Sequence, residues 1–163
     1  HQVISEGLPG RTTVHDDIVE GGMRNGLTVL PSILQSHAPI DLMVLMLGTN
    51  DLKHRFSVTA FEISRSLERM VLATRAEGVV TDILLVSPAP VREAGVLKDV
   101  FAGAEDRQQD LTGFIAAAAA RQGVGFFDAG SVVTVSPDDG VHWDAASHHA
   151  MGAAMAQAVA AWL

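Results

Sequence analysis

The six consecutive apolar residues at positions 42–47 constrain the fold more than any other feature of this sequence. A strand with one face in water alternates apolar and polar side chains, so an unbroken apolar run indicates a strand that is covered on both faces. Strands of this kind occur mainly in parallel sheets that have helices on both sides. The run therefore predicts an α/β protein.

The rest of the chain alternates between strand and helix patterns. Strands are predicted at residues 3–5, 41–47, 82–87 and 123–127, and helical stripes of apolar residues lie at 27–34, 63–74 and 111–118. Gly78 is expected to end the second helix, and Asp144 to cap the last. In that last helix, four residues are expected to face inward: Met151, Met155, Ala158 and Trp162. The alternation predicts a parallel sheet between two helical layers, in one domain spanning residues 1–163.

Composition excludes several classes of protein. The chain is 48% hydrophobic and 18% charged, which provides enough apolar material for a core and argues against disorder. Its net charge of −8 and the lack of a basic face argue against nucleic-acid binding. The sequence contains no run of about 20 apolar residues, so no membrane span is predicted. Cysteine is absent, so thiol chemistry and disulfides are excluded. With no visible signal peptide, a cytoplasmic location is favoured, although export is not excluded.

Polar, glycine-containing segments follow the predicted strands, where open parallel sheets bind their ligands. Asp139 precedes His142 by three residues in one such loop. An aspartate at this spacing can accept a hydrogen bond from one imidazole nitrogen and leave the other free to take a proton from a serine. The alternative is a structural loop in which Asp139 caps the backbone and His142 is simply exposed to solvent.

Asn50 follows the apolar strand by three residues, in the segment Gly48-Thr49-Asn50-Asp51. Its side-chain amide can donate a hydrogen bond to an oxyanion, as amides do in acyl transfer. The alternative is an ordinary turn, since Asn and Asp are common where strands end. The backbone N–H of Gly10 is a second candidate donor, although a loop glycine can also serve only a turn.

Taken together, these segments resemble a known family. Residues 47–51 (Leu-Gly-Thr-Asn-Asp) and 139–142 (Asp-Gly-Val-His) are similar to two of the blocks that define the SGNH, or GDSL-type, hydrolases. Residues 6–13 resemble the glycine block, particularly that of the arylesterase and acyltransferase-like branch. The resemblance implies a flavodoxin-like α/β/α sandwich with Gly10 and Asn50 as oxyanion donors. It also implies that His142 is the general base and then acid, and that Asp139 is its orienting carboxylate.

The same resemblance implies chemistry without a metal or other cofactor. Family members hydrolyse acyl esters, including some acetylated sugars. The branch also contains enzymes that pass the acyl group to alcohols, and these tend to form oligomers. We therefore expect a small-molecule ester as substrate, no nucleic-acid or membrane partner, and a homo-oligomer.

One block of the family is missing. Neither Gly-Asp-Ser-Leu nor the Gly-X-Ser-X-Gly motif of another hydrolase fold occurs in the sequence. In the family, the strand that ends in the nucleophilic serine lies between the strands corresponding to residues 3–5 and 42–47. We expect a segment upstream of His1 to supply both strand and serine, so that the domain is N-terminally incomplete. Direct pairing between residues 3–5 and 42–47 would contradict this expectation.

Two other functions compete with a serine hydrolase. A zinc hydrolase would use Asp139, His142, His148 and His149, but adjacent histidines on a helix point in different directions. A non-catalytic binding domain on a hydrolase scaffold would account for the missing serine, because a fold does not establish an activity.

The remaining conspicuous residues have ordinary interpretations at the sequence level. Residues 15–17 (His-Asp-Asp) are interpreted as a solvated loop. Lys53 and Arg55 either contact a polar substrate or are simply exposed. Trp143 either lines a leaving-group pocket or lies partly buried under the last helix.

Overall fold

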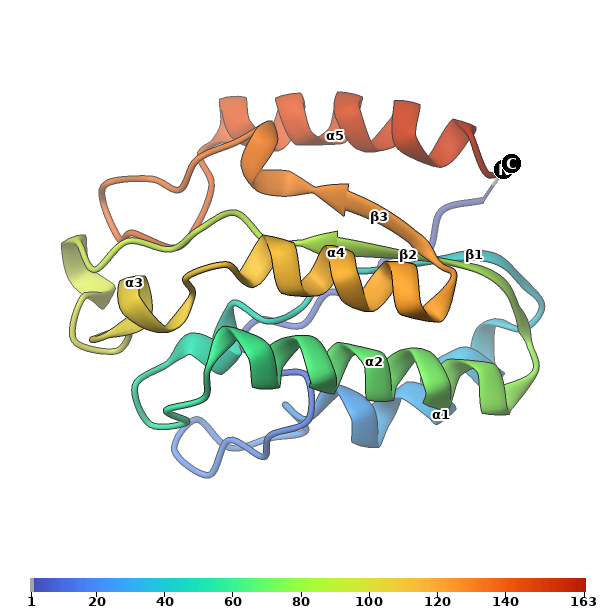
Figure 1. Ribbon diagram of the computed structural model, residues 1–163, viewed down its shortest axis with the longest axis horizontal. Coiled ribbons are helices and arrows are strands. Elements are labelled where there is room, and N and C mark those ends of the chain that lie inside the picture. The colour runs from blue at the N-terminus through green and yellow to red at the C-terminus, as the bar shows by residue number, and fades with distance from the viewer. Residues whose placement is uncertain (1) are drawn as a thin grey trace.

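The computed structural model describes residues 2–163 as a three-layer α/β/α sandwich (Figure 1). Its sheet has three parallel strands in the order β1-β2-β3. Their bounds are β1 Ile40–Leu45, β2 Val80–Ser87 and β3 Gly125–Asp128. Helices α1, α2 and α4 cover one face of the sheet and α5 covers the other. The predicted fold class is confirmed.

The helices begin and end close to the predicted positions. Their bounds are α1 Gly26–His37, α2 Ala60–Glu77, α3 Ala104–Arg107, α4 Leu111–Gln122 and α5 Ala145–Ala160. Helix α2 ends at Gly78, whose φ of 69° lies in the left-handed region that favours glycine. Asp144 caps α5 by accepting a hydrogen bond from the backbone N–H of Ser147 at 2.7 Å. Both helix boundaries are therefore confirmed.

Strand β2 shows why the sheet is covered on both sides. Ile83 and Leu85 pack against the core formed with α1, α2 and α4. The alternate residues Leu84 and Val86 pack on the opposite face, with Met151 of α5. Since successive side chains in a strand point to opposite faces, alternate residues of the apolar run at 83–86 pack against the helices on opposite sides of the sheet.

Two details of the sheet differ from the sequence-based expectation. The apolar run at 42–47 is incompletely covered, because Val44 and Met46 are 41% and 40% exposed, and within the described residues β1 has a strand neighbour on one side only. Residues 3–5 form no strand, and Val3 is 91% exposed. A strand forms where a neighbour completes its hydrogen bonds, and no described segment pairs with residues 3–5. The prediction of a strand there is wrong for this structure.

Helix α5 buries less of its surface than its sequence suggests. Met151 is 6% exposed, and Met155 packs against the same core, as predicted. Trp162, which was expected to face inward from the helix, lies beyond the helix end against Gly125 and remains 39% exposed. None of the helices in the described part of the chain is both long and apolar enough to cross a bilayer.

Candidate active site

His142 and Asp139 are in direct contact in the loop between β3 and α5. The Nδ1 atom of His142 lies 2.7 Å from Oδ2 of Asp139. The imidazole side chain is 72% exposed, and its Nε2 atom has no hydrogen-bond partner among residues 2–163. The ring is therefore oriented through one nitrogen while the other faces outward, which is the arrangement of a histidine that acts as a general base.

The second oxygen of Asp139 holds the loop itself. Its Oδ1 accepts hydrogen bonds from the backbone N–H groups of Val141, at 2.8 Å, and of His142, at 2.9 Å. Partial burial raises the pKa of the Asp139 carboxyl, but these backbone bonds and the contact with the imidazole outweigh it, so the pKa lies below its ordinary value. The carboxylate is thus ionised at neutral pH. Asp139 therefore fits both sequence interpretations, because Oδ1 caps the loop and Oδ2 contacts the His142 ring.

The Asp139–His142 loop is anchored to the segment that follows β2. The backbone N–H of Arg92 donates to the carbonyl of Gly140 at 2.7 Å, and that of Val96 donates to Asp138 at 3.1 Å. Gly140 has a φ of 75°, and a Cβ there would lie 2.2 Å from the Arg92 carbonyl oxygen. Only glycine fits this close approach. The irregular segment after Pro88 therefore holds the Asp139–His142 loop in place.

Asn50 and Gly10 are brought together by a different pair of loops. Asn50 begins a 3₁₀ turn, Asn50–Leu52, after β1, and its Nδ2 donates to the carbonyl oxygen of Arg11 at 3.1 Å. Leu8-Pro9-Gly10-Arg11 is a tight turn closed by a 3.1 Å hydrogen bond from Arg11 N–H to Leu8 O, with Gly10 at φ 80°. Proline followed by a positive-φ glycine is the signature of a type II turn.

These contacts leave both candidate donors with hydrogen-bonding capacity. A carboxamide carries two N–H groups, and Asn50 uses one of them on Arg11. The Gly10 N–H donates to no acceptor within residues 2–163. Two donors on neighbouring loops are thus available for an anion.

The two pairs of residues lie at the same edge of the sheet. Asn50 follows β1 and His142 follows β3, and the carboxyl ends of parallel strands share one edge. A hollow of about 310 Å³ lies beside β1 and is lined by Val44, by Met46 just after the strand and by Trp143, the residue after His142. Met151 and Met155 of α5 complete this lining. Trp143, which is partly buried, thus both lines a hollow and contacts the last helix.

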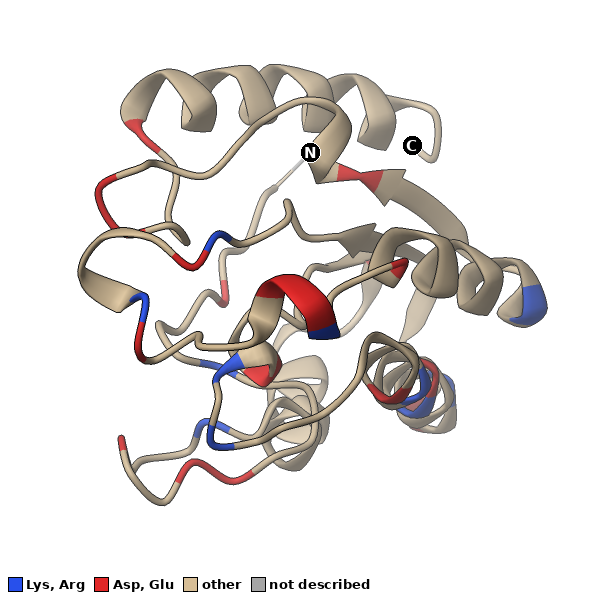
Figure 2. Ribbon diagram, turned by 60° about the vertical axis from the view of Figure 1, so that its left-hand side comes forward, with Lys and Arg blue, Asp and Glu red and all other residues tan. Residues whose placement is uncertain are grey.

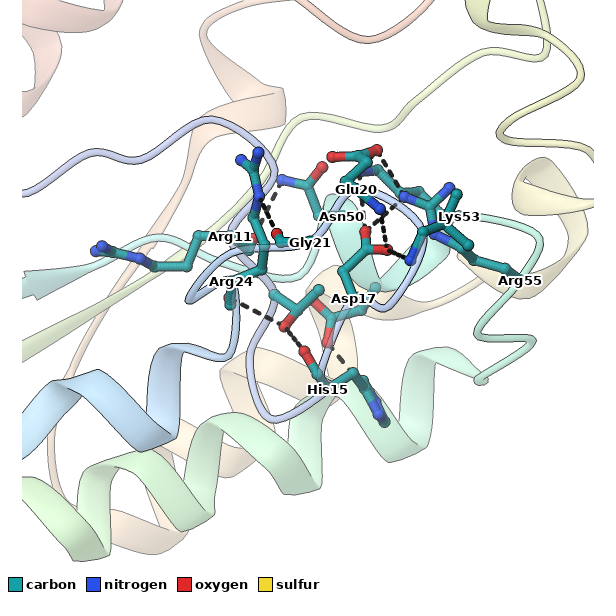
Figure 3. A network of polar contacts seen from close by, with 12 residues as sticks. Arg11, His15, Asp17, Glu20, Gly21, Arg24, Asn50, Lys53 and Arg55 are labelled. Carbon is teal, nitrogen blue, oxygen red and sulfur yellow. Dashed lines mark hydrogen bonds and ion pairs between the residues drawn. The ribbon is translucent and has the colours of Figure 1, made fainter.

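Four charged side chains beside the Asn50 loop form a cluster that contradicts the sequence interpretation. Arg55 Nη2 lies 2.5 Å from Asp17 Oδ2 and 2.6 Å from Glu20 Oε1, and Lys53 Nζ lies 2.5 Å from the same Glu20 atom (Figure 3). Asp17 is 3% exposed and Lys53 is 4% exposed. The interpretation as solvated is therefore wrong for Asp17, and Lys53 is not simply exposed, whereas Asp16 and Arg55 are exposed. Contact of Lys53 or Arg55 with a polar substrate stays a prediction. These charges are neutralised by partners more than thirty positions away in the chain.

This cluster stabilises the protein through Asp17. Burial raises the pKa of the Asp17 carboxyl, but hydrogen bonds from Arg55 and from the N–H groups of Glu20 and Val19 outweigh it and lower the pKa from 3.8 to about 2. A carboxyl whose pKa is lowered on folding stabilises the protein above its unfolded pKa, and this stabilisation is lost as the pH falls through the folded pKa.

We expect Asp17→Asn to lower the free energy of unfolding by about 2 kcal/mol at pH 7. The difference in unfolding free energy between variant and wild type should shrink as the pH falls from 3.8 toward about 2. In this range the Asp17 carboxyl of the wild type becomes protonated, first in the unfolded state and then in the folded state. Urea unfolding across this range measures it. Asp16→Asn, at the neighbouring exposed position, is the matched control and should change stability by less than about 0.5 kcal/mol. A pH-independent loss in Asp17→Asn would contradict the electrostatic origin.

Comparison with known proteins identifies the family. The profile of the GDSL-like Lipase/Acylhydrolase family matches residues 1–150. The chain belongs to this family. No curated protein sequence matches the chain.

Solved structures of similar proteins agree with this GDSL-like assignment. A carbohydrate acetylesterase family member from Sinorhizobium meliloti is 40% identical with a TM-score of 0.92, and the match covers 97% of this chain and 78% of that one. The inhibitor-bound aryl esterase of M. smegmatis is 35% identical with a TM-score of 0.91, over 99% and 79% of the two chains. A putative arylesterase from Agrobacterium tumefaciens is 36% identical with a TM-score of 0.89, over 99% and 80%. This GDSL-like protein is accordingly a carboxylic ester hydrolase of the SGNH fold.

Sequence reasoning missed one residue at the site of this GDSL-like hydrolase. Asp51 is fully buried and accepts hydrogen bonds from Thr13, whose position in the chain is 38 residues away. The only local signal was its place directly after Asn50, which equally suits a turn. The cluster proposed for zinc, by contrast, does not assemble: residues 2–163 contain no group of three histidine or carboxylate side chains placed to hold a metal. His148 instead contacts the Trp143 ring edge-on at 5.4 Å.

Proposed function

We propose that this GDSL-like protein hydrolyses small carboxylic esters with a Ser-His-Asp triad in which His142 is the base and Asp139 orients it. The observation that carries the proposal is the 2.7 Å contact between His142 Nδ1 and Asp139 Oδ2, while Nε2 has no hydrogen-bond partner among residues 2–163. An exposed histidine that only capped a loop would need no ionised carboxylate on its ring. The contact fixes the tautomer in which Nε2 accepts a proton.

The oxyanion of the tetrahedral intermediate would be held by Asn50 and Gly10. Asn50 is supported in this role by its hydrogen bond to Arg11 O, which orients the amide and leaves its second N–H unused. Gly10 is supported by its N–H, which lies in a type II turn and donates to no acceptor within residues 2–163. Fixed donors of this kind stabilise developing negative charge without reorganising during the reaction.

The serine would come from a strand outside these 163 residues that pairs with the free edge of β1. Val44 and Met46 at this edge are partly exposed, and the hollow beside them reaches Trp143, the residue after His142. A parallel strand added here would end at the same sheet edge as β1, beside the Asn50 loop. The similar esterases are longer than this chain, which covers 78–80% of their length.

The cycle follows from this arrangement. His142 takes the hydroxyl proton as the serine attacks the ester carbonyl, and the carbonyl oxygen becomes an anion held by Asn50 and Gly10. His142 then returns the proton to the leaving alcohol as the C–O bond breaks. Water, activated in the same way, releases the acid. A second alcohol in place of water would give acyl transfer, and measuring the new ester formed when a primary alcohol is added to the assay distinguishes the two outcomes.

The substrate class that we propose is acetyl esters of sugars or of aromatic alcohols. The support comes from the similar structures, which are described as a carbohydrate acetylesterase and as aryl esterases. The polar loops at the sheet edge are compatible with a hydroxylated or aromatic leaving group, since small-molecule sites combine apolar walls with a few polar groups.

Labelling of the full-length polypeptide with a serine-directed fluorophosphonate tests the proposal. We expect a single labelled serine in a peptide outside the 163 residues, and we expect the label to abolish hydrolysis of aryl acetate. Peptide mapping by mass spectrometry identifies the residue. Label on a serine within these residues would overturn the assignment of the nucleophile, and a protein that neither takes the label nor hydrolyses esters would be the non-catalytic binding domain.

A further inference from the structure

Asp51 is a fully buried carboxylate that the catalytic cycle does not use. It is 0% exposed and stands next to Asn50 in the 3₁₀ turn after β1. Its two oxygens accept the backbone N–H of Thr13 at 3.1 and 3.0 Å, and Oδ1 also accepts the Thr13 hydroxyl at 2.5 Å. His15 Nε2 lies 3.8 Å from Oδ1. One carboxylate thus joins the loop after β1 to the segment that carries the Gly10 turn.

In the Asp51–Thr13 contact the side chain accepts, whereas in the Asn50–Arg11 contact the side chain donates. Asn50 donates from its side chain to the backbone of Arg11, while Asp51 accepts on its side chain from the backbone of Thr13. Consecutive residues on one loop therefore contact alternate residues on the other, Arg11 and Thr13, and Gly10 directly precedes Arg11. Two crossed contacts of this kind restrict both the separation and the relative rotation of the two segments.

Burying the Asp51 carboxylate costs desolvation free energy, so the need to fill space does not explain why a carboxylate occupies this position. Burial raises the pKa of the Asp51 carboxyl, and the hydrogen bonds from Thr13 only partly offset this. An apolar residue of similar size would avoid that desolvation cost. The gain from the carboxylate is directional, because it accepts two donors of a single residue in one fixed geometry.

We propose that Asp51 and Thr13 form a positioning pair that sets the distance between the Asn50 amide and the Gly10 N–H. The inference rests on the proposed function, in which these two groups are the oxyanion donors. Such donors act only when they lie about 2.7–3.1 Å from the position of the oxyanion. Since the donor residues Gly10 and Asn50 lie far apart in the sequence, their spacing depends on contacts between the two loops.

The expected effect is on turnover and not on substrate binding. Thr13→Val removes the hydroxyl donor but keeps the backbone N–H, and we expect kcat to fall roughly tenfold, since misplacement by about 1 Å can cost about 10²-fold. Asp51→Asn places an amide NH₂ against donors of Thr13, and we expect a fall of roughly 10- to 100-fold. KM should change less than about twofold, because the donors act chiefly in the transition state.

The experiment measures kcat and KM of the full-length enzyme for an aryl acetate. Thr13→Ser, which keeps the hydroxyl, should recover most of the turnover lost in Thr13→Val. Thr74→Val is the matched control, because Thr74 is also 0% exposed but its hydroxyl contacts only Met43 Sδ, at 3.7 Å. It should lower thermal stability without changing kcat. If Asp51→Asn does not fold, the Thr13 variants carry the test.

A double-mutant cycle separates positioning from a purely structural role. Asn50→Ala alone should lower kcat by about 10²–10³-fold. If Asp51 acts through Asn50, adding Asp51→Asn or Thr13→Val to Asn50→Ala should cost much less than it does in the wild type. Full additivity, or an unchanged kcat in both single variants, would overturn the positioning role while leaving the proposed function intact. An unchanged kcat in Asn50→Ala would instead overturn the oxyanion role of Asn50 in the proposed function.

Discussion

Replacing His142 by alanine is expected to lower kcat of the full-length enzyme by roughly 10⁴- to 10⁶-fold. Without the imidazole, the serine hydroxyl has no base, and its attack depends on the oxyanion donors alone. The fold should be unaffected, because the side chain is 72% exposed and its hydrogen bond is to Asp139, within the same loop. Steady-state hydrolysis of an aryl acetate measures the loss, and thermal unfolding measures the integrity of the fold.

The control for this variant is His149→Ala. His149 is exposed on α5, seven positions after His142, and should be replaceable with less than about a twofold change in kcat, as expected for surface positions away from the site. If His142→Ala loses less than about tenfold, the proton is transferred by another group, because general acid–base catalysis usually contributes about 10²–10⁴-fold.

Replacing Asp139 by asparagine is expected to lower kcat by roughly 10³- to 10⁴-fold with the loop preserved. An asparagine oxygen at the position of Oδ1 still accepts the N–H groups of Val141 and His142. Its NH₂ group replaces Oδ2, however, and faces His142 Nδ1 at 2.7 Å. A donor there selects the tautomer with the proton on Nε2, which cannot accept a proton from the serine. The rate of fluorophosphonate labelling should fall in parallel with kcat.

Asp138→Asn is a matched control for this prediction, because Asp138 is the preceding residue and is exposed. It removes the same charge from the same loop and should leave kcat within about twofold. Equal losses in the two variants would show that the effect comes from the net charge of the loop, and a nearly normal Asp139→Asn would remove the orienting carboxylate from the mechanism.

The charged residues of the molecule lie mainly in the loops at this sheet edge and on the helices of one face (Figure 2). Helix α5, by contrast, carries no Lys, Arg, Asp or Glu after its capping Asp144. Composition alone reports only a net charge of −8. The positions of the charged residues in the fold determine which of them form ion pairs, as Asp17 and Arg55 do, and which are solvated.

Much of the candidate site was predictable because its signals are local. Asp139 and His142 lie three positions apart, so a single tight loop is enough to bring the carboxylate to the ring. Asn50 stands three residues after an apolar run, and Gly10 follows a proline in a turn. Each of these features depends on a few consecutive residues, whose side chains and backbone restrict the local conformation. The catalytic roles of these residues remain predictions, which the variants above test.

The sequence by itself determined the parallel α/β architecture, the ends of α2 at Gly78 and of α5 at Asp144, and the contact within the Asp139–His142 loop, since each follows from hydrophobic periodicity or from short-range backbone chemistry. Only the tertiary structure decided that Asp17 and Asp51 are buried and that residues 3–5 form no strand. Burial of a carboxylate depends on donors that the chain brings from more than thirty positions away, and a strand depends on a neighbour along its edge. Both are properties of long-range pairing, which a local pattern of residues does not contain.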